Sequence, residues 1–116
     1  MSCDVTAVEL EENNLKVLRE NAIGIENHKS YQGDVLNFQF EDNFFDLVHC
    51  LGSMLQLYNR KDKDRAISEI IRVCKPKGIY MFAYLTRSYM VWTYGVRKGK
   101  LVNIDALNSD GSIKIF

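Results

Sequence analysis

The first part of the chain has two strand-like segments with hydrophobic residues at helical spacing between them. Residues 5–10 form a β-branched run that is typical of a strand, and residues 28–32 are a second, weaker strand candidate. Between them, within residues 11–22, hydrophobic side chains recur at helical spacing, namely Leu15, Leu18 and Ala22. This part of the chain therefore predicts a strand–helix–strand unit.

A second unit of the same kind follows. Residues 45–51 predict a strand that is buried on both faces, because their apolar content barely alternates. Residues 60–74 predict a helix that Asn59 caps, with an apolar stripe made of Ile67, Ile70, Ile71 and Cys74. A Pro–Lys–Gly turn then ends the helix, and residues 79–85 predict another strand.

The order of these elements predicts an α/β layer structure with a mainly parallel sheet. At 116 residues the chain has room for a single domain, residues 1–116. Residues 86–116 are less regular and predict a lid or hairpin segment, since Asp110-Gly111 favours a hairpin turn. The apolar strand pattern continues up to Phe116, which suggests a truncated piece of a larger fold.

Composition narrows the possible functions. Lys plus Arg and Asp plus Glu both number 15, so the net charge is zero and argues against a nucleic-acid-binding protein. No apolar run is long enough to span a bilayer, and the first residues do not form a secretory signal. Cys3, Cys50 and Cys74 are too widely spaced for a disulfide framework or a zinc site. We therefore expect a cytoplasmic protein without a metal site or a membrane partner.

The candidate chemistry lies at the carboxyl ends of the predicted strands, where open α/β sheets bind their ligands. Glu9 ends the first strand, and its carboxylate suits a ribose diol. Gly33-Asp34 ends the second, where glycine lets the backbone approach a ligand and Asp34 suits an exocyclic amine. Taken singly, Glu9 also fits the start of a helix and Gly33-Asp34 fits an ordinary turn. Their joint placement favours a nucleotide site.

The ordered series of motifs resembles the class I S-adenosylmethionine-dependent methyltransferases. The motifs are VTAVEL (5–10), QGDV (32–35), FDLVHCLG (45–52) and VCKPKG (73–78), and the likeness covers about residues 5–99. The resemblance implies a Rossmann-like three-layer sandwich, a truncated methyltransferase fold in this chain. It also implies that S-adenosylmethionine is the cofactor and that a small molecule accepts the methyl group.

The resemblance assigns roles to individual residues. Glu9 and Leu10 correspond to the ribose position, and Gly33, Asp34 and Val35 to the adenine position. Cys50 and Leu51 correspond to the sulfur end of the cofactor. His49 is a weaker candidate neighbour of the methyl group or the acceptor, with a buried structural histidine as the favoured interpretation. Tyr89 and Trp92 are weak candidates for the acceptor pocket.

The sequence departs from the family pattern in the glycine-rich loop, because it contains no G-x-G-x-G run. The family strand that should lie between the strands at 5–10 and 45–51 is also missing, as are the last strands. The gap predicts that these two strands pair directly or that a second copy contributes a strand, so we expect a homo-oligomer. A non-catalytic adenosine-binding or regulatory module of the same fold is the alternative. A dehydrogenase fragment, and nucleic-acid binding by residues 87–100, are less favoured.

Overall fold

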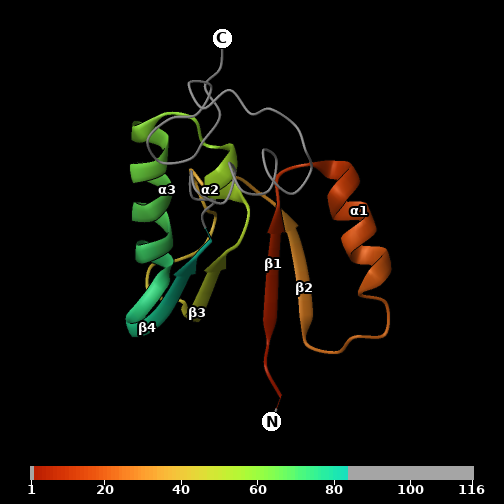
Figure 1. Ribbon diagram of the computed structural model, residues 1–116. Coiled ribbons are helices and arrows are strands. Elements are labelled where there is room, and N and C mark those ends of the chain that lie inside the picture. The colour runs from red at the N-terminus through yellow and green to blue at the C-terminus, as the bar shows by residue number, and fades with distance from the viewer. Residues whose placement is uncertain (1, 84–116) are drawn as a thin grey trace, which may run out of the picture.

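The computed structural model describes residues 2–83 (Figure 1). Strands and helices follow one another in the expected order, and the described elements are β1 (Val5–Glu9), α1 (Glu12–Asn21), β2 (His28–Gln32), β3 (Phe45–Cys50), α2 (Ser53–Gln56), α3 (Arg60–Val73) and β4 (Cys74–Phe82). The α/β class is confirmed. The predicted lid or hairpin segment, residues 86–116, lies outside the described residues.

The strands form two parallel pairs. β1 pairs with β2 from Val5 opposite His28 to Glu9 opposite Gln32, and β3 pairs with β4 up to Cys50 opposite Phe82. Within residues 2–83, β1 and β3 do not pair with each other, so direct pairing across the predicted gap was the wrong expectation. Figure 1 shows β3 and β1 as the inner strands, with β4 and β2 outside them and all four arrows pointing the same way.

From β1 the chain moves outward to β2, and from β3 it moves outward to β4, so the two units run in opposite directions from the space between β1 and β3. Because strand–helix–strand crossovers are right-handed, the two units place α1 and α3 on opposite faces of the strand layer. This arrangement is the layered Rossmann-like order, and it sets the point where strand order reverses between β1 and β3.

The buried stripe of α3 differs from the predicted one. Asn59 caps the helix as expected, since its Oδ1 accepts a hydrogen bond from the Asp62 amide at 2.7 Å. Ile70 and Cys74 are buried as predicted, but the other buried positions are Ala66 and Val73, and Ile71 is 47% exposed. Positions 66, 70 and 73 recur at four and three residues and share one helix face, which Ile71 does not. Together with Cys50 and Met54 of the β3–α2 segment, Ala66 and Ile70 form the core.

Two further expectations for the second unit are corrected. β3 is not buried on both faces, because Leu47 is 49% exposed and His49 is also exposed. Strand β4 begins directly at Cys74 rather than after the turn. Its register jumps so that Phe45 faces Cys74 and Leu47 faces Ile79, and Lys77 adopts a left-handed φ of 67° within the resulting bulge. The Pro–Lys–Gly turn therefore lies inside the strand.

None of the helices in the described part of the chain is both long and apolar enough to cross a bilayer.

Candidate functional site

The carboxyl ends of the four strands meet at one edge of the structure, the end to which the arrows point in Figure 1. Pairing places Glu9 beside Gln32, with Gly33 and Asp34 directly after it, and places Cys50 beside Phe82. The structure thus brings together all three strand ends that the sequence singled out. Tyr89 and Trp92 lie outside the described residues.

Hydrogen bonds fix the end of β1 and the turn after it. The half-buried Glu9 carboxylate accepts a hydrogen bond from the Glu11 amide at 3.1 Å, and the Glu9 carbonyl accepts one from the Gly33 amide at 3.1 Å. The Gln32 side-chain amide donates to the Leu10 carbonyl at 3.1 Å. The two neighbouring strand ends are therefore joined, and one Glu9 carboxylate oxygen, Oε1, is oriented by the backbone.

Gly33 lies where the backbone leaves little space for a side chain, and Asp34 directly after it has an exposed carboxylate. A Cβ atom at position 33 would lie 2.9 Å from Val8 Cγ1, so the close approach of β2 to β1 leaves little room for a side chain. Asp34 is exposed, and its Oδ1 accepts a hydrogen bond from the Leu36 amide at 2.9 Å. Val35 is half-buried and packs against the core. Asp34 is therefore held in a local turn with its carboxylate at the surface.

The end of β3 divides between a buried and an exposed residue. The Cys50 side chain is 5% exposed and packs in the core, and its carbonyl accepts a hydrogen bond from the Ala83 amide at 3.0 Å. Burial raises the pKa of the Cys50 thiol, an effect that hydrogen bonding to Met54 and Ser53 partly opposes. A protonated, buried thiol is a poor nucleophile. Leu51, at 63% exposed, is the side chain that this strand end presents.

The residues on either side of Cys50 correct one expectation and show a helix directly after the strand end. His49 is exposed, so the favoured interpretation as a buried structural histidine was wrong. It lies on β3 directly before Cys50, where it is accessible near the strand end. The segment after Leu51 is a short helix, α2, with the buried Met54 at its second position. That anchor explains the helix, because Met54 joins the core.

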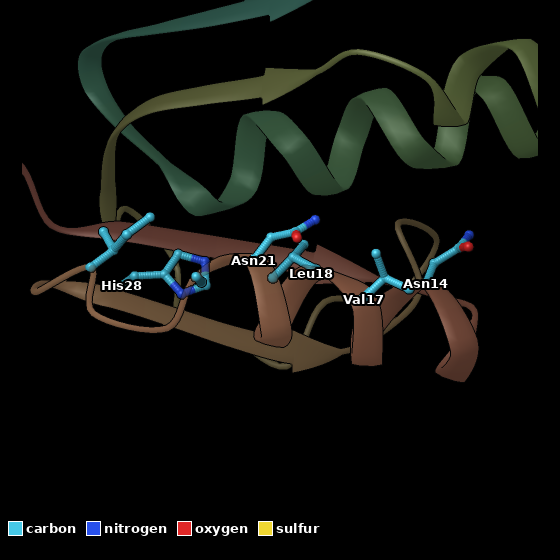
Figure 2. Close-up of a pocket in the computed structure, with 7 residues that line it drawn as sticks. Asn14, Val17, Leu18, Asn21 and His28 are labelled. Carbon is cyan, nitrogen blue, oxygen red and sulfur yellow. The ribbon is translucent and has the colours of Figure 1, made fainter.

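A hollow of about 510 Å³ lies elsewhere, along α1 (Figure 2). Its lining residues come from α1, the loop that follows it and the first residue of β2, namely Asn14, Val17, Leu18, Asn21, Ala22, Ile25 and His28. None of the residues singled out for cofactor binding lines it. Within residues 2–83 there is also no cluster of three or more His, Cys, Asp or Glu side chains arranged to hold a metal ion.

Sequence reasoning missed the side chains that hold the loop carrying Asp34. Arg65, Glu69 and Arg72 extend from α3 to the backbone of residues 36–40. The sequence offered only the spacing of Glu69 and Arg72, three residues apart on a helix, and that spacing is equally typical of a surface ion pair.

Comparison with known proteins agrees with this arrangement. A family model described as a methyltransferase domain matches residues 1–78. A demethylmenaquinone methyltransferase of Staphylococcus aureus (strain JH9) is 40% identical over 76 residues, which are 66% of this chain and 30% of that protein. The chain thus spans less than a third of the length of the curated relatives it matches.

Solved structures show the same fold. A Pyrococcus horikoshii OT3 protein superposes with a TM-score of 0.66 at 24% identity, covering 90% of this chain and 45% of the other. A Methanosarcina mazei structure described as an S-adenosylmethionine-dependent methyltransferase gives a TM-score of 0.68 at 16% identity, covering 82% and 47%. A putative methyltransferase of Bacillus halodurans C-125 gives 0.59 at 27% identity, covering 81% and 42%.

Proposed function

The chain belongs to the methyltransferase domain family, and from that premise we propose that it is part of a cytoplasmic S-adenosylmethionine-dependent methyltransferase with a small-molecule acceptor. One observation carries the proposal: parallel strands present Glu9, Gly33-Asp34 and Leu51 at a single edge. The Staphylococcus aureus relative, a demethylmenaquinone methyltransferase by name, supports a small acceptor.

The residues at this edge fit the adenosine half of the cofactor. A ribose diol and the adenine amine are hydrogen-bond donors, and carboxylates are acceptors. Glu9 and Asp34 each have one carboxylate oxygen bonded to a backbone amide, at 3.1 and 2.9 Å, which orients the second oxygen for a ligand. We assign the ribose to Glu9 with Leu10, and the adenine to Gly33, Asp34 and Val35.

The chemistry needs positioning more than acid–base groups. When bound, the cofactor supplies a methyl group on a sulfonium, which an acceptor takes by in-line displacement. The contribution of this chain is to bind the cofactor and to orient it toward the acceptor. Holding two reactants in a productive geometry by itself accelerates a reaction between them. Leu51 would cover the sulfur end beside the Cys50 backbone, and exposed His49 lies next to that position as a candidate acceptor contact.

Calorimetric titration of the full chain with S-adenosylhomocysteine tests the proposal. The wild type should show saturable binding, and Glu9→Gln should weaken it about tenfold or more, because hydrogen bonds to a charged acceptor contribute about 1.5–3 kcal/mol each. Glu20→Gln, an exposed position on α1, is the matched control and should bind as the wild type does. Absence of saturable binding, or equal affinity of Glu9→Gln and wild type, would overturn the proposal.

A second candidate is a module that binds adenosine without catalysis. The observation that favours it is the lack of a G-x-G-x-G run in these 116 residues, so that binding by this chain relies on the adenosine half. Adenosine and S-adenosylhomocysteine would then bind with similar affinity. A methyltransferase site would bind S-adenosylhomocysteine more tightly than adenosine.

The gap between β1 and β3 supports a proposal about assembly. Both inner strands have one unpaired edge within the described residues, and Val5 on β1 and Leu47 on β3 are each 49% exposed. Unpaired strand edges favour the addition of a further strand. We propose a homo-oligomer in which a second copy contributes a strand, and sedimentation velocity over a range of concentrations tests it. A monomer at all concentrations would contradict it.

A further inference from the structure

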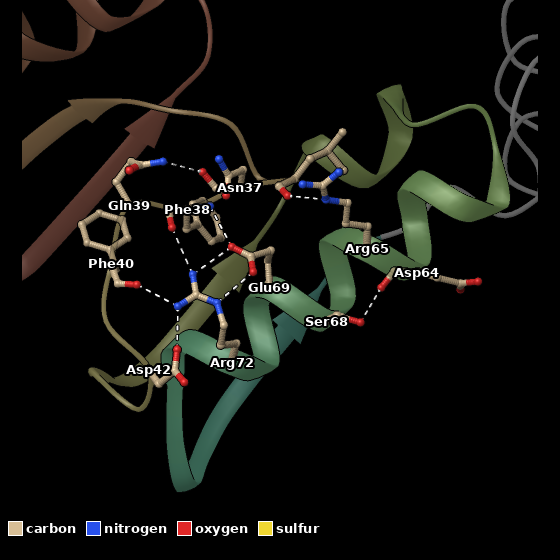
Figure 3. A network of polar contacts seen from close by, with 11 residues as sticks. Asn37, Phe38, Gln39, Phe40, Asp42, Asp64, Arg65, Ser68, Glu69 and Arg72 are labelled. Carbon is tan, nitrogen blue, oxygen red and sulfur yellow. Dashed lines mark hydrogen bonds and ion pairs between the residues drawn. The ribbon is translucent and has the colours of Figure 1, made fainter.

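Helix α3 holds the loop between β2 and β3 through three side chains, which Figure 3 shows extending from the helix to the loop backbone. Arg65, Glu69 and Arg72 form this set, which we call the α3 clasp. Arg65 Nε donates to the Leu36 carbonyl at 2.8 Å. Glu69 accepts a hydrogen bond from the Phe38 amide at 2.8 Å. The clasp thus begins two residues after Asp34.

Arg72 uses every hydrogen-bond donor that a guanidinium has. Its Nε and Nη2 bind the two Glu69 carboxylate oxygens at 2.8 and 2.9 Å, and Nη2 also donates to the Phe38 carbonyl at 3.0 Å. Its Nη1 donates to the Phe40 carbonyl at 2.8 Å and to Asp42 Oδ1 at 2.7 Å. Five donors in one plane are satisfied at once, an arrangement that a lysine ammonium does not reproduce.

The loop has few hydrogen bonds of its own beyond its first turn. Asp34 accepts from the Leu36 and Asn37 amides, at 2.9 and 3.0 Å. After that turn the backbone bonds to α3, since the Asn43 and Phe44 amides also donate to carbonyls at the end of the helix, both at 2.9 Å. Beyond the first turn, the backbone of the loop is therefore held by hydrogen bonds to α3 rather than by hydrogen bonds within the loop.

We infer that Arg72 and Glu69 are positioning residues for Asp34, and that the α3 clasp sets the affinity of the chain for the adenine part of its cofactor. The inference rests on the proposed function. It follows from a continuous path: the turn that orients the Asp34 carboxylate includes Leu36, Arg65 holds Leu36, and Glu69 and Arg72 hold Phe38. Val35, Leu36 and Phe38 also pack on the core beside α3, which ties the same segment to the helix.

The test compares Arg72→Lys with Arg60→Lys in the full chain. Both changes replace an arginine on α3, but the Arg60 side chain is 93% exposed and pairs, among residues 2–83, with Asp64 at 3.7 Å. We expect Arg72→Lys to weaken S-adenosylhomocysteine binding about tenfold, and Arg60→Lys to leave it unchanged. Without ligand, the Leu36 amide should exchange its hydrogen faster in Arg72→Lys alone.

Two double-mutant cycles separate positioning from a general loss of structure. In an Asp34→Asn background, Arg72→Lys should add almost no further loss of binding, because the group it positions is already changed. In a Glu9→Gln background it should keep its full tenfold effect. Glu69→Gln, which preserves shape and removes the charge, serves in the same cycles should Arg72→Lys not fold.

The outcomes distinguish the two claims. If the wild type binds S-adenosylhomocysteine and the two variants Arg72→Lys and Glu69→Gln bind it with the same affinity, the positioning role of the clasp is overturned and the proposed function stands. Equal, additive losses in both cycles would show a general structural effect and would also overturn it. No binding by the wild type would overturn the proposed function, and this role of the clasp with it.

Discussion

Replacing Gly78 by alanine should destabilise the chain more than any other glycine-to-alanine change in the described residues whose φ is negative. An added Cβ atom would lie 2.6 Å from Cys74 Sγ, 2.9 Å from the Lys75 carbonyl oxygen and 3.0 Å from the Asp46 carbonyl oxygen. Two of these atoms are backbone and cannot move without opening the bulge of β4 or its pairing with β3. Overpacking of this kind costs about 2–3 kcal/mol.

Urea unfolding followed by circular dichroism measures the effect. With an m value of about 1.5 kcal/mol per M, the midpoint should fall by roughly 1.5 M without a change in m. Gly52→Ala is the matched control, because nothing lies within 4 Å of its Cβ position and its φ is −145°. That control should stay within about 0.5 kcal/mol of the wild type. Equal midpoints for the two variants would refute the packing argument at the bulge.

Three further predictions concern α3 and the bulge. Hydrogen bonding to Arg72 lowers the pKa of Glu69 below its ordinary 4.5, so the Glu69 carboxylate stabilises the fold above that pH and this contribution is lost as the pH falls through the lowered pKa. The free energy of unfolding of Glu69→Gln should therefore fall less steeply in acid than that of the wild type, and identical acid profiles would contradict this. Ile70→Ala, at a fully buried position, should lower the free energy of unfolding in urea by about 2–5 kcal/mol, whereas Ile71→Ala, at a 47% exposed position, should lower it by less than about 1 kcal/mol. Similar losses for the two variants would contradict the assignment of the buried face of α3. Lys77→Gly should relieve the left-handed φ of 67° and raise the free energy of unfolding by up to about 1 kcal/mol, which is seen as a higher thermal midpoint. A lowered midpoint would show that the lysine side chain itself stabilises the bulge.

The sequence predicted the order of elements well because each has a strong local pattern. The β-branched run at residues 5–10 favours an extended backbone, and the helical spacing at 60–74 follows from the face that the helix buries. The cap at Asn59 is likewise local, since it joins residues three apart. Parallel pairing followed from the strand–helix–strand order, and so did the meeting of Glu9 with Gly33-Asp34 at one edge.

What the sequence did not predict depends on contacts between distant segments. Whether Ile71 or Val73 faces the core is decided by how α3 meets β3 and β4, and spacing alone allowed both. His49 is exposed because the face of β3 that carries it is uncovered within the described residues. The α3 clasp joins side chains to carbonyls about 30 residues away, and a carbonyl leaves no signature in the sequence.

The most direct measurement of the central claim is a nuclear magnetic resonance titration of the labelled chain with S-adenosylhomocysteine, read at each backbone amide. The account predicts saturable shifts at three separate strand ends, residues 9–11, 33–36 and 50–52, with one common affinity. Shifts confined to the hollow along α1, around Val17 and Ile25, would contradict it. A spectrum that stays unchanged up to the highest ligand concentration would contradict it too, because the carboxyl ends of these strands would then not form an adenosine site.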